Sequence, residues 1–205
     1  MTIATVSKET RTRGRPRQFD MDTALDKALR VFSERGYHAA SISELTEAME
    51  VAAGSVYKAF RDKRGIFLAA FDRYRAVRLG LLDARLAKVE TGRDKLREVL
   101  ASYVISSHGE SGRRGCLVVG SANELALFDE EAANRVAAAF ATDEASIAEL
   151  IRLGQRDGSI SSEIDASATA RALVCLTKGM RVVGKTGPNE EDMASVAEIA
   201  LKLLT

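Results

Sequence analysis

At 205 residues, with 46% apolar and 29% charged residues, the chain has the composition of a globular protein and room for one large or two small domains. It lacks the apolar N-terminal stretch of a secretion signal and any apolar run of membrane-spanning length, and its two cysteines, Cys116 and Cys175, are too few for a disulfide framework or a metal site. These features argue against a secreted or membrane-spanning protein and predict a cytoplasmic one.

The net charge of +1 hides an asymmetry along the chain. Residues 1–75 contain 14 Lys or Arg against 10 Asp or Glu, whereas the remainder contains 16 against 19. Few prolines and the absence of a sustained alternation of β-branched residues predict an all-α protein. A basic front end before a mildly acidic remainder is typical of a nucleic-acid-binding head attached to a body that does not bind nucleic acid.

Residues 1–18 form a polar, basic stretch that includes the sequence Gly-Arg-Pro-Arg. The stretch has too few apolar residues to pack, so we expect a disordered arm. Arg15 and Arg17 are of the kind that insert into a minor groove or follow phosphates, and we expect them to add DNA affinity with little sequence information. A solubilising tail is the alternative interpretation.

A first helix is predicted from a cap at Asp20 or Asp22 to about Arg35, where Gly36 ends it. Residues 41–63 then predict two short helices joined by a tight turn. Ser41 and Glu44 have the spacing of a capping box, which satisfies free amides at the start of the first short helix.

The second short helix is predicted to run to about Ala59, with Val51, Val56 and Phe60 facing inward. Its outer face is small near the start and polar or basic towards the end: Ala53, Gly54, Ser55, Tyr57 and Lys58. A helix with a small N-terminal part can approach a surface closely, and its free amides suit phosphate oxygens. The pair therefore has the pattern of a helix-turn-helix whose second helix lies in a DNA major groove. A helical hairpin that never binds nucleic acid is the alternative.

The stretch from Phe19 to Tyr74 resembles the DNA-binding domain of TetR/AcrR-family transcriptional regulators. The resemblance rests on residues at fixed offsets over about fifty positions: Ala28, Phe32, Gly36, Tyr37, Ser41, Ile42, Leu45, Val51, Gly54, Ser55, Tyr57, Phe60, Lys63, Ile66 and Phe67. Glu50 stands where the family usually has glycine, Ala52 where it often has a capping serine, and Met49 where alanine is usual.

The resemblance implies double-stranded DNA with a palindromic operator as the partner. It assigns Tyr57 to the phosphate backbone, places variable DNA-contacting side chains at Ser43 and Lys58, and agrees with a phosphate contact by Lys63. The DNA-binding set that we predict is Arg15, Arg17, Ser41, Ser43, Ala53, Gly54, Ser55, Tyr57, Lys58 and Lys63.

Beyond the head, the pattern predicts a long helix that starts at an Asp62 cap and runs to about Glu90, linking the head to a second domain. A fifth helix follows Thr91-Gly92. Residues 108–115 are a loop on composition. Gly115-Cys116-Leu117 resembles a subset of the family in which these residues open the sixth helix. Helices starting at Asp129 and capped by Asp165, and a last helix running to the C-terminus, complete the prediction.

The expected fold is therefore all-α, with about nine helices in total. We divide it into a basic arm (1–18), a three-helix helix-turn-helix DNA-binding domain (19–65) and a larger helical effector-binding and dimerisation domain (66–205). The last two helices are amphipathic and joined by a short turn, so they form an antiparallel pair. The resemblance implies that this pair meets its copy in a second subunit as a four-helix bundle.

The sequence contains no constellation of nucleophile, base and oxyanion donor, so we do not expect an enzyme, and we expect no cofactor or metal. The family uses a cavity in the second domain to bind an unknown small-molecule effector, and Tyr103, Phe140 and Met180 are candidates to line it; plain core packing is the alternative for each.

Cys116 is a second candidate sensor, because a helix start and the preceding Arg113 and Arg114 would favour a reactive thiolate. A buried, inert cysteine is the alternative. The overall prediction is a DNA-binding regulator of transcription, a repressor that an effector releases from its operator. A redox- or electrophile-sensing regulator acting through Cys116 is the first rival, and a protein-interaction module without DNA binding is the second.

Overall fold

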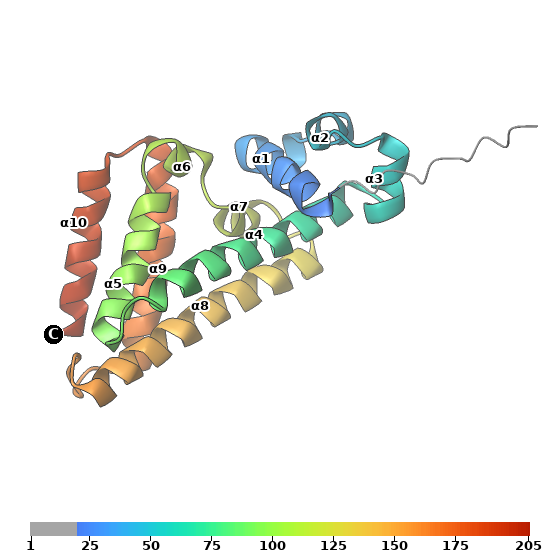
Figure 1. Ribbon diagram of the computed structural model, residues 1–205. Coiled ribbons are helices and arrows are strands. Elements are labelled where there is room, and N and C mark those ends of the chain that lie inside the picture. The colour runs from blue at the N-terminus through green and yellow to red at the C-terminus, as the bar shows by residue number, and fades with distance from the viewer. Residues whose placement is uncertain (1–19) are drawn as a thin grey trace, which may run out of the picture.

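The structure is a computed structural model, and it describes residues 20–205. These residues form α-helices and two short 3-10 turns, without a β-strand. The all-α prediction is therefore confirmed. Helices α1 (Met21–Ala39), α2 (Ile42–Met49) and α3 (Ala53–Phe60) form a small head, and α4 (Lys63–Leu86) leads from the head into the body (Figure 1).

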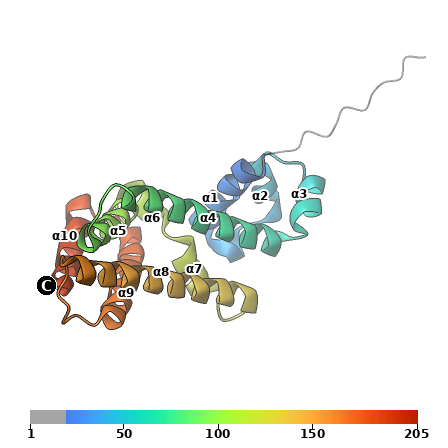
Figure 2. The same ribbon diagram turned by 60° about the horizontal axis from the view of Figure 1, so that its bottom comes forward.

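The body contains the remaining six α-helices of the described chain. They are α5 (Gly92–Ser106), α6 (Gly109–Arg114), α7 (Leu117–Glu124), α8 (Glu130–Asp157), α9 (Ala166–Val183) and α10 (Glu190–Leu201), with 3-10 turns at Gly184–Thr186 and Lys202–Leu204. Figure 2 shows α4 and α8 running between the two ends of the molecule, with α7 between them on the side of the head. A separate buried cluster of apolar side chains from α5, α8, α9 and α10 holds the far end of the body together.

Capping contacts confirm the predicted starts of α1, α2, α4, α8 and α9. The Ser41 hydroxyl accepts the N–H of Glu44 at 3.1 Å, and the Glu44 carboxylate accepts the N–H of Ser41 at 3.0 Å, which completes the capping box. Asp62 caps α4 by accepting the N–H of Gly65. Asp20, Asp129 and Asp165 cap α1, α8 and α9 at the predicted starts, Thr91 caps α5 and Asn189 caps α10, whereas α3 and α7 have no side-chain cap among the described residues. Local contacts of this kind can be predicted from the sequence because both partners lie within one helical turn.

The prediction of a loop over residues 108–115 is wrong, because the structure forms the short helix α6 there. The helix is added to the nine that the sequence predicts. Its cause is tertiary packing: a Cβ placed on Gly112 would lie 2.8 Å from both the carbonyl oxygen of Gly184 and that of Ser107. Only a glycine lets α6 approach so closely, and Gly115, with φ of 79°, ends the helix.

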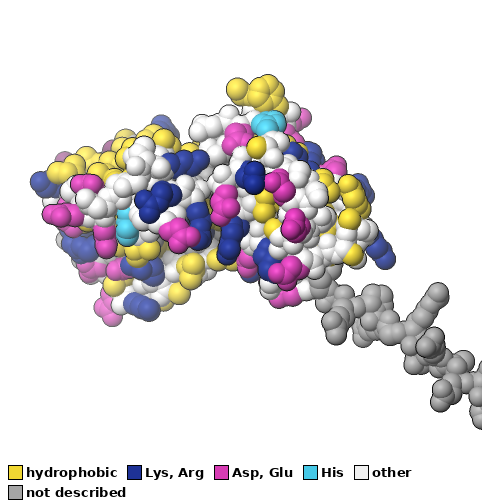
Figure 3. Space-filling model, turned by 90° about the horizontal axis from the view of Figure 1, so that it is seen from above, with side chains coloured by type: hydrophobic (Ala, Val, Ile, Leu, Met, Phe, Trp, Pro, Cys, Tyr) yellow, Lys and Arg dark blue, Asp and Glu magenta, His cyan; other side chains and the backbone are white. Residues whose placement is uncertain are grey.

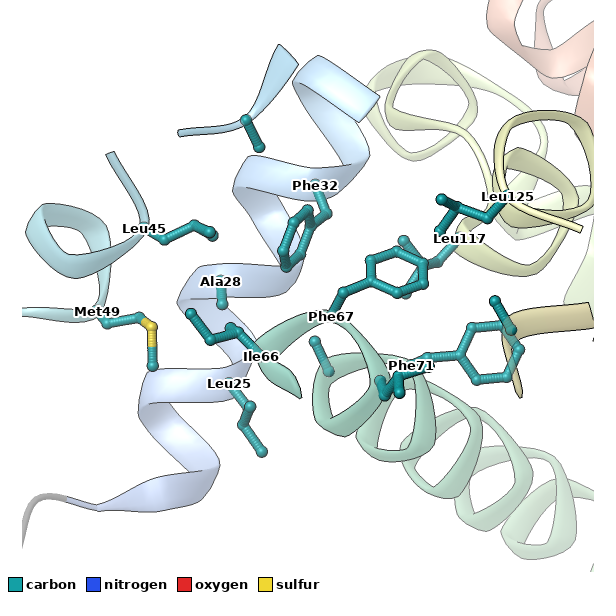
Figure 4. Close-up of a cluster of buried hydrophobic side chains, with 14 of the residues drawn as sticks. Leu25, Ala28, Phe32, Leu45, Met49, Ile66, Phe67, Phe71, Leu117 and Leu125 are labelled. Atoms are coloured by element: carbon teal, nitrogen blue, oxygen red, sulfur yellow. The ribbon is translucent and has the colours of Figure 1, made fainter. Parts of the chain in front are cut away.

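The core of the head extends into the body. Phe67 of α4 lies edge-on to both Phe32 and Tyr37, with ring centroids 5.1 Å away in each case. Leu117 and Leu125, at the two ends of the α7 segment, pack on the same cluster (Figure 4). Head and body therefore share one apolar core, so a displacement of α7 acts directly on the head.

An ion pair also joins head and body. The guanidinium of Arg64, in the first turn of α4, donates to the carboxylate of Asp129, with Nη2 at 2.9 Å from Oδ1. The same carboxylate accepts the N–H of Ala132 and so caps α8. The hydrogen bonds from Arg64 and then from Ala132 lower the pKa of Asp129 from 3.8 to about 2.

Replacing Asp129 with alanine is expected to lower the free energy of unfolding at neutral pH by about 2 kcal/mol, because the cap and the charge-assisted hydrogen bond are lost together. Since the pKa of Asp129 is depressed on folding, this contribution is complete above pH ~4 and disappears as the pH falls towards about 2. Urea unfolding at pH 7 and pH 3 checks both statements. Asp165→Ala is the matched control, because it removes an equivalent cap that has no guanidinium hydrogen bond; an equal loss in the two variants would contradict a role for Arg64.

Within residues 20–205, no helix is long and apolar enough to cross a membrane. The same residues contain no cluster of three or more His, Cys, Asp or Glu side chains suited to hold a metal ion.

Candidate DNA interface and sensor cavity

The turn between α2 and α3 has a left-handed residue at its centre. Glu50 adopts φ 56° and ψ 36°, a conformation that costs a non-glycine residue about 1 kcal/mol or more. Its N–H donates to the carbonyl of Glu47, and its carboxylate lies 2.7 Å from the ammonium of Lys27 on α1. The turn thus keeps the conformation that glycine would adopt freely, although glutamate occupies the position.

Helix α3 is held to the head by one face only. Val51 and Val56 are buried, and Phe60 packs partly buried on the same core. The opposite face is open to solvent, with Tyr57 50% exposed, and it comprises the predicted residues Ala53, Gly54, Ser55, Tyr57 and Lys58. Ala52 offers no side chain to cap the helix, so the first turn of α3 meets its surroundings through backbone amides.

The other predicted DNA-binding residues lie in three situations. Ser43 is exposed on α2, whereas the hydroxyl of Ser41 is occupied by the capping box. The ammonium of Lys63 donates to the carbonyls of Tyr37 and Ala40 at 3.0 Å and of His38 at 3.3 Å. Arg15 and Arg17 lie outside the described residues.

The partners of Lys63 explain why a cation stands in the first turn of α4. The Lys63 ammonium donates to the carbonyls at the end of α1, where a cation is favourable. The same ammonium lies 4.5 Å from the centre of the Tyr37 ring. This role is structural, so a change in DNA affinity on replacing Lys63 would not by itself report a phosphate contact. A phosphate contact by Lys63 stays a prediction.

A cavity of about 360 Å³ lies in the body between α4, α5 and the helices that face them. Tyr103 and Cys116, two of the four predicted sensor residues, line it. Met180 instead belongs to the buried core of the body, and Phe140 packs beside the core shared with the head; neither lines the cavity. Apolar side chains of α4 and α5 form much of the wall: Leu79, Leu81, Leu82 and Ile105.

Two family models match the chain, and between them they cover head and body. Residues 24–70 match the bacterial regulatory proteins of the tetR family, and residues 92–198 match the tetracyclin repressor-like C-terminal domain. The chain belongs to the TetR family. The resemblance seen in the sequence is thereby confirmed, and the protein is a DNA-binding regulator of transcription.

Individual TetR-family relatives are similar over most of the chain. The transcriptional repressor ComR of Escherichia coli is 28% identical over 194 residues, which cover 94% of this chain and 92% of ComR. The transcriptional regulator AcuR of Cereibacter sphaeroides is 31% identical over 170 residues, or 78% and 76% of the two chains. A cysteine mutant of the regulator CifR, solved with 26-bp double-strand operator DNA, is 32% identical with a TM-score of 0.83 and covers 94% of this chain and all of CifR.

In this TetR-family chain, Cys116 lies at the cavity wall and at the start of α7. The Tyr74 hydroxyl donates to its sulfur at 3.5 Å. Burial by itself would raise the pKa of the Cys116 thiol, but the hydrogen bonds from Tyr74 and from the N–H of Val119, together with the charges of Arg181 and Lys178, make the net pKa shift downward. Cys116 is half-buried and borders the cavity, and the lowered pKa of its thiol favours the thiolate.

The C-terminal end of α7 contacts the DNA-binding head. The carboxylate of Glu124 accepts the N–H of Tyr37 at 2.8 Å. Gly36 makes this approach possible, because a Cβ there would lie 2.6 Å from the Glu124 carboxylate, and its φ is 78°. Helix α7, with eight residues and a length of about 12 Å, thus connects the cavity with the end of α1, which leads into α2 and α3.

The polar and charged side chains around the cavity were not predicted from the sequence. Tyr74, Arg78, Asp143, Lys178 and Arg181 all line it. The one signal available was that Lys178 and Arg181 stand one helical turn apart in a largely apolar stretch, where an exposed face was the natural interpretation.

Proposed function

We propose that the protein is a homodimeric, one-component repressor that a small-molecule effector releases from its operator. The observation that carries the proposal is the course of α4: its first turns belong to the core of the head, and its later turns form a wall of the cavity. One rigid element therefore joins the helix that would contact DNA to the place where a ligand would bind. We keep the division at residues 65 and 66 as a working boundary between head and body.

The exposed face of α3 is the proposed reading surface. Small residues at its start allow the helix to enter a major groove, and Tyr57 and Lys58 lie where they could contact phosphates or base edges. Ser43 is exposed on α2, the first helix of the motif, and we assign it to a neighbouring phosphate. Arg15 and Arg17 are assigned to the minor groove or the backbone by their composition alone.

The dimer is proposed to form through α9 and α10. Val196 and Ile199 of α10 and Leu203 of the 3-10 turn that follows it recur at helical spacing on the outward face, and Ile199 is 56% exposed. On α9, Val182 and Val183 are about half exposed. Hydrophobic side chains gather at the end of the molecule that α10 occupies (Figure 3). An apolar stripe of this kind is covered when two copies pair as a four-helix bundle.

Release follows from the two connections between cavity and head. A ligand that pushes α4 or α7 changes the position of the head through the shared core and through the Glu124 contact. Two heads on one face of DNA must be about 34–36 Å apart, or a multiple of that distance. The effector lowers DNA affinity only if it binds the two head positions unequally. Regulation without turnover needs no catalytic group, and we propose that the protein acts in the cytoplasm, on DNA, without being an enzyme.

Binding to the DNA upstream of its own gene tests the regulator proposal. Fluorescence anisotropy with a labelled duplex is expected to show specific binding that is at least about 1000-fold tighter than binding to an unrelated duplex, with a steep salt dependence. Equal affinity for the two duplexes at moderate salt would remove the proposal.

Electrophile sensing through Cys116 is the second candidate function, and the Tyr74 hydrogen bond and the downward pKa shift support it. Iodoacetamide forms an S–C bond with a thiolate as the C–I bond breaks and iodide leaves. We expect it to modify Cys116 before Cys175, although Cys175 is the more exposed. The adduct, which enters the cavity, is expected to weaken operator binding about tenfold.

Peptide mass spectrometry after limited alkylation, followed by anisotropy, measures both effects. Cys116→Ser should keep DNA binding and lose the response to iodoacetamide, whereas Cys175→Ser should respond like the wild type. Preferential modification of Cys175, or an adduct at Cys116 that leaves operator affinity unchanged, would rule this candidate out.

A further inference from the structure

Arg181 is a buried cation whose hydrogen-bonding capacity is largely unused. The residue lies on α9 and is 4% exposed. Its Nη2 donates to the carbonyl of Gly115, but Nε and Nη1 have no hydrogen-bond partner among the described residues. A guanidinium stays charged at any physiological pH, and a buried charge without an anionic partner is costly. A buried guanidinium of this kind is suited to bind an anionic group.

The cavity beside Arg181 has a marked excess of positive charge. Its walls carry six Lys or Arg side chains and a single carboxylate, that of Asp143. Asp143 is already shared by Arg75, at 2.9 Å, and Lys178, at 2.5 Å, while Arg85 is paired with Glu98. Among the described residues, Arg78 on α4 donates to the neutral hydroxyl of Ser106 and to no carboxylate. Arg78 and Arg181 thus face the cavity without a carboxylate partner from the described chain.

The rest of the cavity is suited to an apolar body. Leu79, Leu82 and Val118 are part of the wall, and Leu82 lies one turn, or about 6 Å, beyond Arg78 along α4. Arg78 and Arg181 also border a smaller cavity of about 200 Å³ next to α1, but its walls are mostly polar. An anionic head group between the two arginines would therefore direct an apolar tail into the larger cavity.

We propose that the effector is an organic monoanion, a carboxylate with a short apolar chain, whose head group is bound by Arg181 and Arg78. The proposal rests on the proposed function, because it takes this cavity to be the effector site. A planar carboxylate matches the paired N–H groups of a guanidinium, and two arginines from different helices would hold it in a fixed orientation.

Binding of the anion has a direct route to the head. Arg181 holds the carbonyl of Gly115, which immediately precedes Cys116 at the start of α7. A carboxylate competes with that carbonyl for the guanidinium, and a loosened Gly115 frees the end of α7 nearest the cavity. Glu124 at the opposite end transmits the change to Tyr37.

Octanoate and octanamide, which are matched in length and differ in charge, test the proposal on the full-length protein. Isothermal titration calorimetry is expected to give a dissociation constant at least about tenfold lower for octanoate. In Arg181→Met this preference should shrink to about twofold or less, whereas Arg171→Met, which removes an exposed arginine of the same helix, should keep it. Circular dichroism checks that the variants fold, and Arg78→Met serves as the second variant if Arg181→Met does not.

Equal or tighter binding of octanamide, no binding of either compound at millimolar concentration, or an undiminished preference in a folded Arg181→Met variant would overturn the anion site. Cys116→Ser should keep the preference for octanoate; its loss would mean that the thiol and not the arginines selects the ligand. Operator release is measured separately. If octanoate binds through Arg181 without weakening operator binding, the anion site is supported but its role in operator release is contradicted. If only octanamide releases the operator, effector release is supported but the anion site is contradicted.

Discussion

Replacing Gly54 with glutamate is expected to abolish specific operator binding without harming the fold. A Cβ at Gly54 would meet no atom of residues 20–205 within 4 Å, and Gly54 lies in the first turn of α3. A carboxylate near a helix N-terminus is favourable, and glutamate is a better helix former than glycine, so stability should rise by about 0.5–1 kcal/mol. The same carboxylate would face DNA phosphates. We expect operator affinity to fall at least about 100-fold, because both half-sites of a dimer are affected.

Gly80→Glu is the matched control for Gly54→Glu. Gly80 is exposed on α4 and lies outside the head, a Cβ there would also meet no atom within 4 Å, and the change in net charge is identical. Anisotropy with the operator duplex and thermal melting measure affinity and stability in parallel. If Gly54→Glu bound the operator as tightly as Gly80→Glu does, α3 could not be the reading helix.

Introducing lysine at both Val183 and Ile199 is expected to separate the subunits and, with them, the two DNA contacts. Four lysines would meet at the paired α9–α10 surface, where each side chain is about half exposed in the single chain. Unpaired charges buried in an interface cost several kcal/mol. The variant should therefore be monomeric at micromolar concentration and bind the operator at least about 1000-fold more weakly, since one head alone makes half the contacts.

The double variant Glu191→Gln/Glu198→Gln controls for the change of charge. This variant also raises the net charge by two units per chain, but at exposed positions of α10 outside the apolar stripe. Analytical ultracentrifugation reports the mass of each species. A dimer that survives in the lysine variant would place the subunit interface elsewhere on the body.

Much of the helix-turn-helix could be predicted from the sequence because its determinants are local. The capping box at Ser41 and Glu44, the cap at Asp62 and the break at Gly36 each depend on residues within one turn of each other. The inward residues of α3 follow from helical periodicity in the same way. Glu50 was the exception: its left-handed conformation is imposed by the turn and supported by Lys27, which is 23 residues away in the chain.

The sensor region could not be predicted to the same depth, because its contacts join distant segments. Helix α6 exists because Gly112 packs on Gly184 and Ser107, although its composition is that of a loop. Arg181 has the spacing of an exposed polar residue on an amphipathic helix, and only the packing of α9 against the start of α7 buries it. Tyr103 lines the cavity whereas Met180 lies in the core, and helical spacing alone could not distinguish these two candidates for the effector pocket.

Hydroxyl-radical footprinting of the operator tests whether two copies of α3 read the DNA. We expect two protected patches on one face of the DNA, with centres about 10 base pairs or a multiple of that number apart, and loss of both patches in Gly54→Glu but not in Gly80→Glu. A single patch, or protection that is unchanged when Gly54 is replaced, would contradict a dimer that reads DNA through two copies of α3.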